Sequence, residues 1–457
     1  MKPYPAYKDS GVPWLGQIPA HWDLHRAKFL FRYRKDLNTN GKETNILSLT
    51  LRGVVNNDPN NPEGLVPKDY STYQKFNAGD LVFKLIDLEN RQTSRVGLVH
   101  EDGIMSPAYL RLIPRNGIST RYFYHQFFDL YLRGVFNQLG AGVRATLGSS
   151  DLLNLRLSVP SLEEQIHIAR FLDAYDRLTR RYIRAQRRLI ALLTEQKQAL
   201  IQQAVTRGLD PDVPLKDSGI EWLGKIPAHW EVSRVKNEFE CLDHRRIPLS
   251  ATERGAMKQR LYDYYGASGV IDRVDDYLFD DELLLLAEDG ANLVLRNLPL
   301  AIIARGKFWV NNHAHILKPK RGNLEYLANV MEMVDYRIWI SGAAQPKLTQ
   351  DRLMAIPIPV PPVEEQELII VQLSNNTAAL RAAITRTQRQ IELVREYRTR
   401  LIADVVTGKL DVRGAALPDL PVDDADFDDA ADLDDEDNFK NALNEEGSIE
   451  EVPDDES

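Results

Sequence analysis

The chain has 457 residues, of which 43% are hydrophobic, so it is long enough for two or three domains with buried cores. No apolar run approaches the length of a membrane-spanning helix and no signal-peptide pattern opens the chain; we therefore expect no membrane contact and a cytoplasmic location. The single Cys241 excludes an intrachain disulfide and suits a reducing compartment, and we expect it to serve packing.

The formal net charge of −9 is unevenly distributed along the chain. Residues 419–457 carry 18 acidic side chains and one basic side chain, which leaves a net charge of +8 on residues 1–418. Such an acidic segment cannot bury a core, so residues 413–457 are predicted to be a disordered tail, either a solubilising extension or a weak competitor for a polyanion-binding surface. The basic body suits a polyanionic partner, although a modest excess also occurs in proteins that bind no nucleic acid.

The first segment of the chain, residues 1–160, opens with a motif that returns later. Lys8–Trp22 reappears as Lys216–Trp230, with twelve of fifteen positions identical at an offset of 208. Self-similarity at this length indicates duplication of a whole unit. The rest of the segment has strand-like stretches at 45–49, 80–86 and 108–113, a helical pattern at 121–135 and an Asn- and Pro-rich loop at 56–67, which together predict a mixed α/β domain.

Residues 161–210 are predicted to form one long helix. No proline follows Pro160 until Pro211, and apolar residues recur at the spacing of a coiled-coil seam, with arginines beside it. The seam residues are Ile168, Phe171, Tyr175, Leu178, Tyr182, Leu189 and Leu192.

The second half of the chain repeats this plan. Residues 211–360 contain a buried strand at 283–287 and a helical pattern at 324–340, with little sequence shared with the middle of the first domain. Residues 361–412 form a second predicted long helix, whose seam residues are Ile370, Leu373, Leu380, Ile384, Ile391, Val394 and Leu401. We predict an α+β protein in which two mixed α/β domains are separated by two long antiparallel coiled-coil helices, with a pseudo-twofold internal repeat. The motifs at both ends of each domain are repeated, whereas the sequences between them differ. This suggests two recognition domains that bind different targets.

The ordered set of duplicated motifs resembles the specificity subunit of a Type I restriction-modification system, over residues 8–412. The resemblance rests on the paired Trp-Leu-Gly-x-Ile-Pro-x-x-Trp openings at Trp14 and Trp222, on Gly79–Phe83, on Gln345–Leu348 and on the Pro-x-x-Glu-Glu-Gln starts of both long helices. The acidic tail is not a feature of that family. The first copy also departs from it, because the loop Gly140–Leu147 lacks the Gln-Pro-Lys of the second copy, which leaves open whether the two loops do equal work.

The resemblance implies a DNA-reading subunit without chemistry of its own. Each target-recognition domain would read one half of a split, asymmetric sequence in double-stranded DNA, and the helices would bind two methyltransferase subunits and, in a larger assembly, restriction and translocase subunits. No cofactor is expected in this chain; S-adenosylmethionine, Mg and ATP would be bound by partner subunits. The sequence agrees, because it has neither the glycine-rich ATP loop nor the Asn/Asp-Pro-Pro-Tyr/Phe tetrapeptide of amino-methyltransferases.

The side chains that would read bases are ranked by their chemistry. Arg and Lys pair with guanine and Asn and Gln with adenine, so the candidates are such residues in polar, turn-like settings, each with solvent or phosphate contact as the alternative. The first domain offers Arg52, Lys84, Asn90, Arg91, Arg95 and Arg144. The second offers Arg245, Arg246, Arg260, Tyr264, Tyr265, Ser268, Asn292, Asn311, Asn312, His313 and Lys347, of which the two tyrosines suit a core equally well.

Other readings of the chain remain open at this point. His313 and His315 lie two apart and would share a strand face, but no third ligand accompanies them, so no metal site is predicted. Leu139–Gly142 resembles a cofactor-binding glycine turn, yet an ordinary turn explains it better. A fused methyltransferase or nuclease lacks its catalytic motifs here. An unrelated coiled-coil assembly protein leaves the basic body and the duplicated domains unexplained.

Overall fold

The computed structural model describes residues 1–50, 53–58, 69–86, 88, 95–140, 146–342 and 346–417. The described chain forms two compact units, and each long helix contributes to both of them. Unit 1 contains residues 1–188 and 388–417, and unit 2 contains residues 189–387. Within the described ranges, no helix is both long and apolar enough to cross a membrane.

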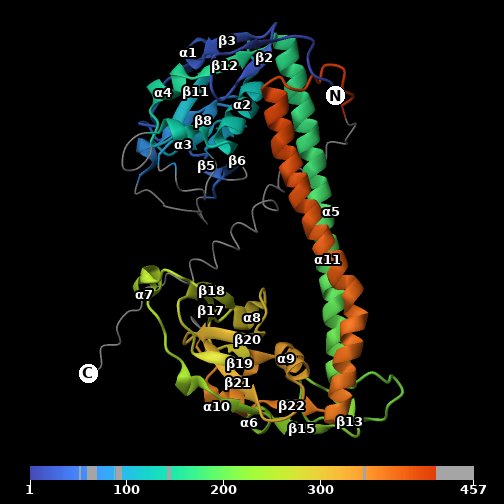
Figure 1. The fold of residues 1–457 in the computed structure, drawn as a ribbon. Helices are drawn as coiled ribbons and strands as arrows, with labels where there is room; N and C mark the ends of the chain where they lie inside the picture. Colours follow the sequence, from blue (N-terminus) through green and yellow to red (C-terminus); the bar gives the residue numbers. More distant parts are fainter. Residues whose placement is uncertain are drawn as a thin grey trace, which may run out of the picture. The chain divides into compact units, whose positions relative to one another are not determined.

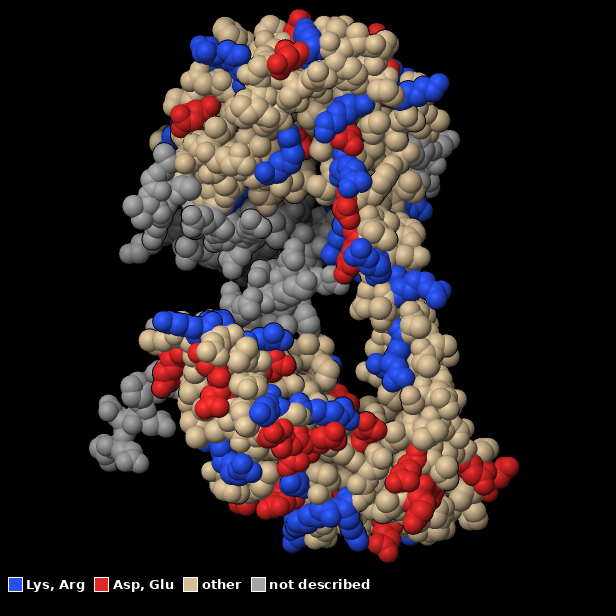
Figure 2. Space-filling view, viewed as in Figure 1, with Lys and Arg blue, Asp and Glu red and all other residues tan. Residues whose placement is uncertain are grey.

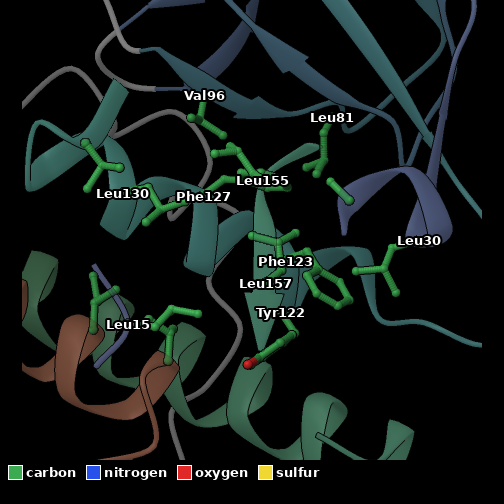
Figure 3. Close-up of a cluster of buried hydrophobic side chains, with 14 of the residues drawn as sticks. Leu15, Leu30, Leu81, Val96, Tyr122, Phe123, Phe127, Leu130, Leu155 and Leu157 are labelled. Carbon is green, nitrogen blue, oxygen red and sulfur yellow. The ribbon is translucent and has the colours of Figure 1, made fainter. Parts of the chain in front are cut away.

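The core of unit 1 is an antiparallel four-stranded sheet, in the order β4-β11-β8-β9, packed against helix α2. Ser119 caps α2 by accepting a hydrogen bond from the Tyr122 backbone N–H. Phe123 and Phe127 point from α2 into the sheet side of the core, where Phe127 meets Phe83 edge-on at 5.0 Å between ring centroids (Figure 3). The strands of this sheet are β4 (Phe31–Tyr33), β8 (Leu81–Phe83), β9 (Val96–Leu98) and β11 (Leu110–Pro114), and α2 is Thr120–Leu132.

Short paired strands and helices complete unit 1. The pairs are β1 (Tyr7–Asp9) with β2 (Gln17–Pro19), β3 (Asp23–Arg26) with β12 (Arg156–Val159), β5 (Leu47–Thr50) with β6 (Gly53–Asn56), and β7 (Gln74–Phe76) with β10 (Gly103–Met105). The short helices are α1 (Ala27–Leu30), α3 (Val135–Leu139), α4 (Ser149–Asn154) and the 3₁₀ turn Tyr70–Thr72.

Unit 2 has the same plan with a larger sheet, in the order β16-β21-β19-β20-β17-β18. β17 and β20 pair in parallel and the other neighbours are antiparallel. The strands are β16 (Phe239–Cys241), β17 (Tyr262–Gly266), β18 (Gly269–Val274), β19 (Phe279–Ala287), β20 (Ala301–Val310) and β21 (Ala314–Pro319). Helix α9 (Leu324–Met333) lies beside the sheet as α2 does in unit 1, and its N-cap is Asn323 (Figure 1).

The remaining elements of unit 2 are short. They are β13 (Leu215–Asp217) with β14 (Lys225–Pro227), β15 (Glu231–Arg234) with β22 (Pro357–Val360), the helices α6 (Val235–Glu238), α7 (Ala251–Ala256), α8 (Asn292–Leu295) and α10 (Gln350–Ala355), and the 3₁₀ turns Asp243–Arg245 and Tyr336–Ile338.

The two predicted long helices are present as α5 (Leu162–Arg207) and α11 (Val363–Val406), and they pack together side by side (Figure 1). In unit 1 Asp176 of α5 accepts from Arg180 and from Arg398 of α11, at 2.9 and 2.5 Å. Burial alone would raise the pKa of Asp176, but the two guanidinium groups lower it well below its ordinary value. The predicted fold class is therefore confirmed.

The predicted seam is correct on α11 and wrong in the middle of α5. Leu178, Tyr182, Leu189 and Leu192 are exposed, the last of them by 54%. The side of α5 that is buried instead runs through Ile183, one position further along, with half-buried Thr179, Gln186, Ile190 and Leu193. Of the other seam residues, Ile168, Phe171, Leu373, Ile391 and Leu401 are buried, and Tyr175, Ile370, Leu380, Ile384 and Val394 are half-buried.

Both units anchor the start of a long helix with the same contacts. In unit 1 Glu164 accepts hydrogen bonds from Trp22 Nε1 at 3.1 Å and from His21 at 3.0 Å. In unit 2 Glu365 accepts from Trp230 Nε1 at 3.0 Å and from His229 at 2.7 Å. The repeated His-Trp and Glu-Glu-Gln motifs are therefore two halves of one anchor, far apart in sequence and in contact in the fold.

The glutamine of each Glu-Glu-Gln motif binds the cap of the helix that covers the sheet. The Gln165 side-chain oxygen accepts from the Ser119 backbone N–H at 2.9 Å, and that of Gln366 accepts from the Asn323 backbone N–H at 2.8 Å. Each amide nitrogen donates to the proline carbonyl that precedes its long helix. A buried glutamine with both ends satisfied fixes the covering helix relative to the long helix in each unit.

Candidate nucleic-acid interface

Several predicted DNA-binding residues of unit 2 meet at one end of its sheet, in loops that we call the loop cluster, residues 288–292, 311–313 and 346–348. These loops follow β19, join β20 to β21, and precede α10. Backbone hydrogen bonds tie them together: the Glu288 N–H donates to the His313 carbonyl at 2.9 Å, and the Leu348 N–H donates to the Glu288 carbonyl at 2.7 Å. Because antiparallel strands bring alternate chain reversals to the same edge, residues 60 apart in sequence form one surface.

Two basic side chains, one inside the loop cluster and one outside it, pair with Glu288. Arg246 forms an ion pair with the Glu288 carboxylate and donates to the Ala314 carbonyl at 3.0 Å. Lys347 Nζ lies 3.4 Å from the same carboxylate, and this lysine is 54% exposed. Arg246 thus has a structural role, because its guanidinium is held by these contacts. Lys347 keeps most of its ammonium available to a phosphate or a base.

Two histidines next to β21 have separate carboxylate partners. His313 is exposed, and its Nδ1 lies 2.9 Å from Asp289 Oδ2. The hydrogen bond with Asp289 raises the pKa of His313 although partial burial opposes it, so the ring is a cation over a wider pH range. His315 is buried, with Nδ1 2.6 Å from Asp243 and Nε2 2.7 Å from the Leu348 carbonyl oxygen. The two rings therefore do not share a ligand.

One group of possible metal ligands occurs among the residues that the structure describes, namely Cys241, Asp243 and His315. Both ring nitrogens of His315 already face oxygen acceptors. Burial raises the pKa of Cys241 to about 12, so its thiol stays protonated near neutral pH. The arrangement is better explained as a buried polar network that holds the loop cluster in place.

The other predicted residues of unit 2 divide between surface and core. Arg245 stacks over Phe279 at 4.7 Å from the ring centroid, and Arg260 pairs with Asp272 at 3.2 Å beyond the opposite end of the β17–β18 hairpin. Asn292 and Asn311 use their side-chain oxygens to accept from the backbone N–H groups of Leu298 and His313. Ser268 is half-buried and Asn312 is exposed.

Tyr264 is a core residue rather than a reader. Its side chain is 1% exposed, and its hydroxyl accepts from the Leu249 N–H at 3.0 Å. Tyr265 packs from a half-buried position against buried residues of the sheet, among them Phe308. Of the two alternatives for this pair, the structure therefore supports packing.

Most candidates of unit 1 fall outside the described residues, namely Arg52, Asn90, Arg91 and Arg144. Lys84 is half-buried. Arg95 is 1% exposed, and its guanidinium donates to the Ile86 carbonyl at 3.0 Å, so its assignment to a DNA-facing surface is corrected. The Ile86 carbonyl, just after β8, is a partner that sequence spacing does not reveal.

Leu147, the last residue of the stretch that lacks Gln-Pro-Lys, makes the same kind of backbone contact as Leu348 of the second copy. The Leu147 N–H donates to the carbonyl of Leu85, just after β8, at 2.9 Å, as the Leu348 N–H does to that of Glu288, just after β19. This backbone contact is thus shared between the units. Sequence reasoning missed the acidic residues Glu288, Asp289 and Asp243, because they carry the wrong charge for DNA and act by positioning cations.

Comparison with known proteins gives a consistent family. The family model described as Type I restriction modification DNA specificity domain matches twice, over residues 34–188 and 227–393. A Methanocaldococcus jannaschii protein described as the specificity subunit of type I restriction enzyme MjaX is 22% identical over 430 residues, which cover 87% of this chain and 96% of that protein.

Two further matches cover different shares of the chain. A Haemophilus influenzae protein described as a type I restriction enzyme specificity subunit is 37% identical over 117 residues, which cover 25% of this chain and 30% of that protein. A solved chain from work on complex assembly and conformational transition of the type I R-M system has a TM-score of 0.57 at 15% identity, covering 86% of this chain and 99% of that one. The structural likeness establishes a shared fold.

Proposed function

The chain belongs to the family of Type I restriction-modification DNA specificity subunits, and from this premise we propose that each unit reads one half of a two-part sequence in double-stranded DNA. The proposal rests on one observation: the same Trp–Glu anchor occurs in both units, whereas the domains that it holds differ in sequence. Trp22 with Glu164 and Trp230 with Glu365 hold two recognition domains in equivalent frames, whereas the surface loops differ. Equal frames with different loops favour two readers of different bases.

In unit 2 the reading surface is the loop cluster. Lys347 and His313 are its exposed cations, and Asn312 is an exposed amide able to pair with adenine. Glu288 and Asp289 orient the cations without neutralising the surface completely. In unit 1 the equivalent place is next to Leu85 and Leu147.

The paired helices bind the catalytic partners. The misassigned seam residues of α5, Leu178, Tyr182, Leu189 and Leu192, form an exposed apolar stripe at heptad spacing, which suits a helix or groove of a protein partner. We assign it to a methyltransferase subunit, two of which would be bound, with restriction and translocase subunits in a larger assembly. Catalysis, and with it S-adenosylmethionine, Mg and ATP, belongs to those partners.

The test is co-expression of the chain with the methyltransferase subunit encoded beside it, followed by mapping of methylated positions in host DNA. We expect one two-part asymmetric motif, methylated only when both proteins are present. The variant Leu189→Ser/Leu192→Ser is expected to lose co-purification with the methyltransferase while keeping its circular dichroism spectrum. Methylation or cleavage by the purified chain alone, free of partners, would contradict the proposal.

A further inference from the structure

The outer strand of the unit 1 sheet and the segment before it carry a group of basic side chains. Residues 24–35, which run from β3 through α1 to β4, contain five Lys and Arg and no Asp or Glu. These five are Arg26, Lys28, Arg32, Arg34 and Lys35, and all of them are exposed. The fold adds two exposed arginines from other parts of the domain, Arg115 and Arg156. We call these seven residues the basic stripe.

Backbone contacts bring the two added arginines to this segment. Arg156 of β12 is the Cα partner of Arg26 in β3. The Arg115 N–H, just after β11, donates to the Leu30 carbonyl at 2.9 Å. Residues directly opposite in an antiparallel pair place their side chains on the same face, with Cβ atoms about 5 Å apart. Like charges in this arrangement repel each other, so an anion bound between Arg26 and Arg156 would stabilise the pair.

The charges of the basic stripe have no acidic partners within the part of the chain that the structure describes. Among those residues, none of the seven side chains forms an ion pair. The Lys28 ammonium lies 5.3 Å from the ring centroid of Phe29, and Phe29 itself is 62% exposed. Exposed cations gathered on one surface are the electrostatic footprint of a site for a polyanion.

The corresponding positions of unit 2 show that the fold does not require these charges. At the offset of 208 residues that relates the duplicated motifs, Arg32 corresponds to Glu240. In the pair of β15 with β22, Pro357 takes the place that Arg156 has in the pair of β3 with β12. Unit 2 forms the same strands with acidic or neutral residues there. The charge of the basic stripe therefore serves a purpose that is specific to unit 1.

The basic stripe extends from the reading edge of the unit 1 sheet, where Leu85 follows β8, to the opposite edge. β4 and β8 are both antiparallel to β11, which lies between them, so they point the same way. Arg34 and Lys35 therefore follow β4 toward the reading edge. Arg26 precedes β4 and Arg115 follows β11, so both lie toward the opposite edge, where α1, β3 and β12 lie together (Figure 1). Lys and Arg side chains are visible at the α1 end of the domain in Figure 2.

We propose that the basic stripe binds the phosphate backbone of duplex DNA outside the recognised motif, next to the half-site read by unit 1. A duplex held at the reading edge can continue along the stripe, because Arg34 and Lys35 start at that edge. Guanidinium and ammonium groups bind phosphate without reading sequence. The stripe therefore adds affinity for flanking DNA and leaves the recognised motif unchanged.

This inference rests on the proposed function, since a flank exists only if unit 1 reads a half-site. An acidic protein surface is the competing occupant. Two copies of one protein partner would meet equivalent surfaces in both units, whereas the basic stripe occurs only in unit 1. This asymmetry favours DNA, and the experiment separates the two occupants.

The test compares variants of the full chain in complex with the methyltransferase. The Gln variant is Arg26→Gln/Lys28→Gln/Arg115→Gln, and the Lys variant, which keeps the charge, is Arg26→Lys/Arg115→Lys. The matched control is Arg234→Gln/Lys236→Gln/Lys320→Gln, which changes the exposed cations at the equivalent positions of unit 2.

The probes are two labelled duplexes that contain the motif found by methylation mapping. One duplex ends at the half-site of unit 1, and the other continues beyond it for about one helical turn. The half-site of unit 1 is identified as the half of the motif that stays unchanged when residues 231–359 are exchanged. Binding is measured by fluorescence anisotropy over a range of salt concentrations.

On the longer duplex we expect the Gln variant to bind about tenfold more weakly than the wild type. The slope of log K against log salt should lose about three units, because three phosphate contacts disappear. On the shorter duplex the Gln variant and the wild type should bind equally. The Lys variant and the unit 2 control should match the wild type on both duplexes, and the methylated motif should be the same for all.

Equal affinity and slope of the wild type and the folded Gln variant on the longer duplex overturn the inference while the two-part motif stands. Weakening by the same factor on both duplexes also overturns it, because the stripe would then contact the half-site itself. Loss of methyltransferase co-purification in the Gln variant overturns it in favour of an acidic protein surface. Absence of a two-part motif for the wild-type complex is a failure of the proposed function instead.

Discussion

The anchors of the two long helices have the same three side chains and different surroundings. Glu365 is 26% exposed, and a covalent connection leads from the end of α5 to β13 beside it. Glu164 is 5% exposed, because the segment before β1 and the segment after α11 meet over it: Tyr4 donates its hydroxyl proton to Glu164 at 2.7 Å, and Arg413 stacks over the Tyr4 ring at 4.9 Å. In unit 1 the two segments that cover Glu164 are not joined in sequence, so buried contacts hold them together. The same motif therefore contributes unequal stability in the two units.

The largest expected difference concerns the two glutamates. Glu164→Ala leaves the buried donors of Tyr4 and Trp22 without an acceptor, and we expect the start of α5 to lose about 4 kcal/mol of local stability. Glu365→Ala leaves one such donor, at a site that water reaches, and should cost about 1 kcal/mol. Hydrogen exchange of peptides from residues 162–170 and 363–371 in the full chain measures both.

A control variant separates the contribution of the segments that cover Glu164 from the contribution of the helix anchor itself. Tyr4→Phe removes one hydrogen bond to Glu164 and should cost about 1 kcal/mol at the start of α5 only. Equal losses for the two glutamate variants would show that the two segments that cover Glu164 contribute nothing.

Alanine in place of the glycine after each long helix should give a smaller difference in stability, again with the larger loss in unit 1. Gly208 and Gly408 both have φ of +75°, so alanine at either position should cost about 1 kcal/mol for the left-handed backbone. A Cβ at Gly408 would lie 2.3 Å from Pro19 Cδ, whereas at Gly208 the nearest atom, of Trp230, is 3.3 Å away. Gly408→Ala should therefore be about 2 kcal/mol more destabilising than Gly208→Ala in urea unfolding. Equal midpoints would contradict the close packing of Pro19 on α11.

The smallest expected difference is a pH effect confined to unit 2. Asp289 raises the pKa of His313. The ring therefore stays charged up to a higher pH than an ordinary histidine, and it loses its charge as the pH rises through the raised pKa. DNA affinity should accordingly fall roughly threefold between pH 6 and pH 9, the size of one exposed ion pair. His313→Gln should remove this dependence, as fluorescence anisotropy would show. A wild-type affinity that is flat over this range would exclude His313 from the interface.

The sequence predicts the duplication, both long helices and the mixed domains, because repeats and heptad spacing are local patterns. It does not predict which stripe of α5 packs on α11, since two neighbouring stripes compete. The more apolar one, with Leu189 and Leu192, is exposed, and the one buried contains Gln186 and Ile183. Apolar character alone does not say whether a stripe is covered by the same chain or by a partner.

The candidate site was predictable to a lesser degree. Loop positions such as Asn312 and Lys347 follow from turn chemistry, and the structure brings them together. The roles of Arg95 and Arg246 depend on partners far along the chain or on backbone oxygens, such as Glu288 and the Ile86 carbonyl. Sequence spacing contains no information on such contacts.

The most direct test of two independent readers is an exchange of residues 231–359 for the matching segment of a relative with a different methylation motif. The joints at residues 231 and 359 lie in β15 and β22, which pair with each other, so the anchor at Trp230 and Glu365 stays intact. Methylation mapping of the exchanged chain, in complex with the methyltransferase, is expected to show one half of the motif replaced and the other half unchanged. A motif in which both halves change together would contradict independent reading by the two units.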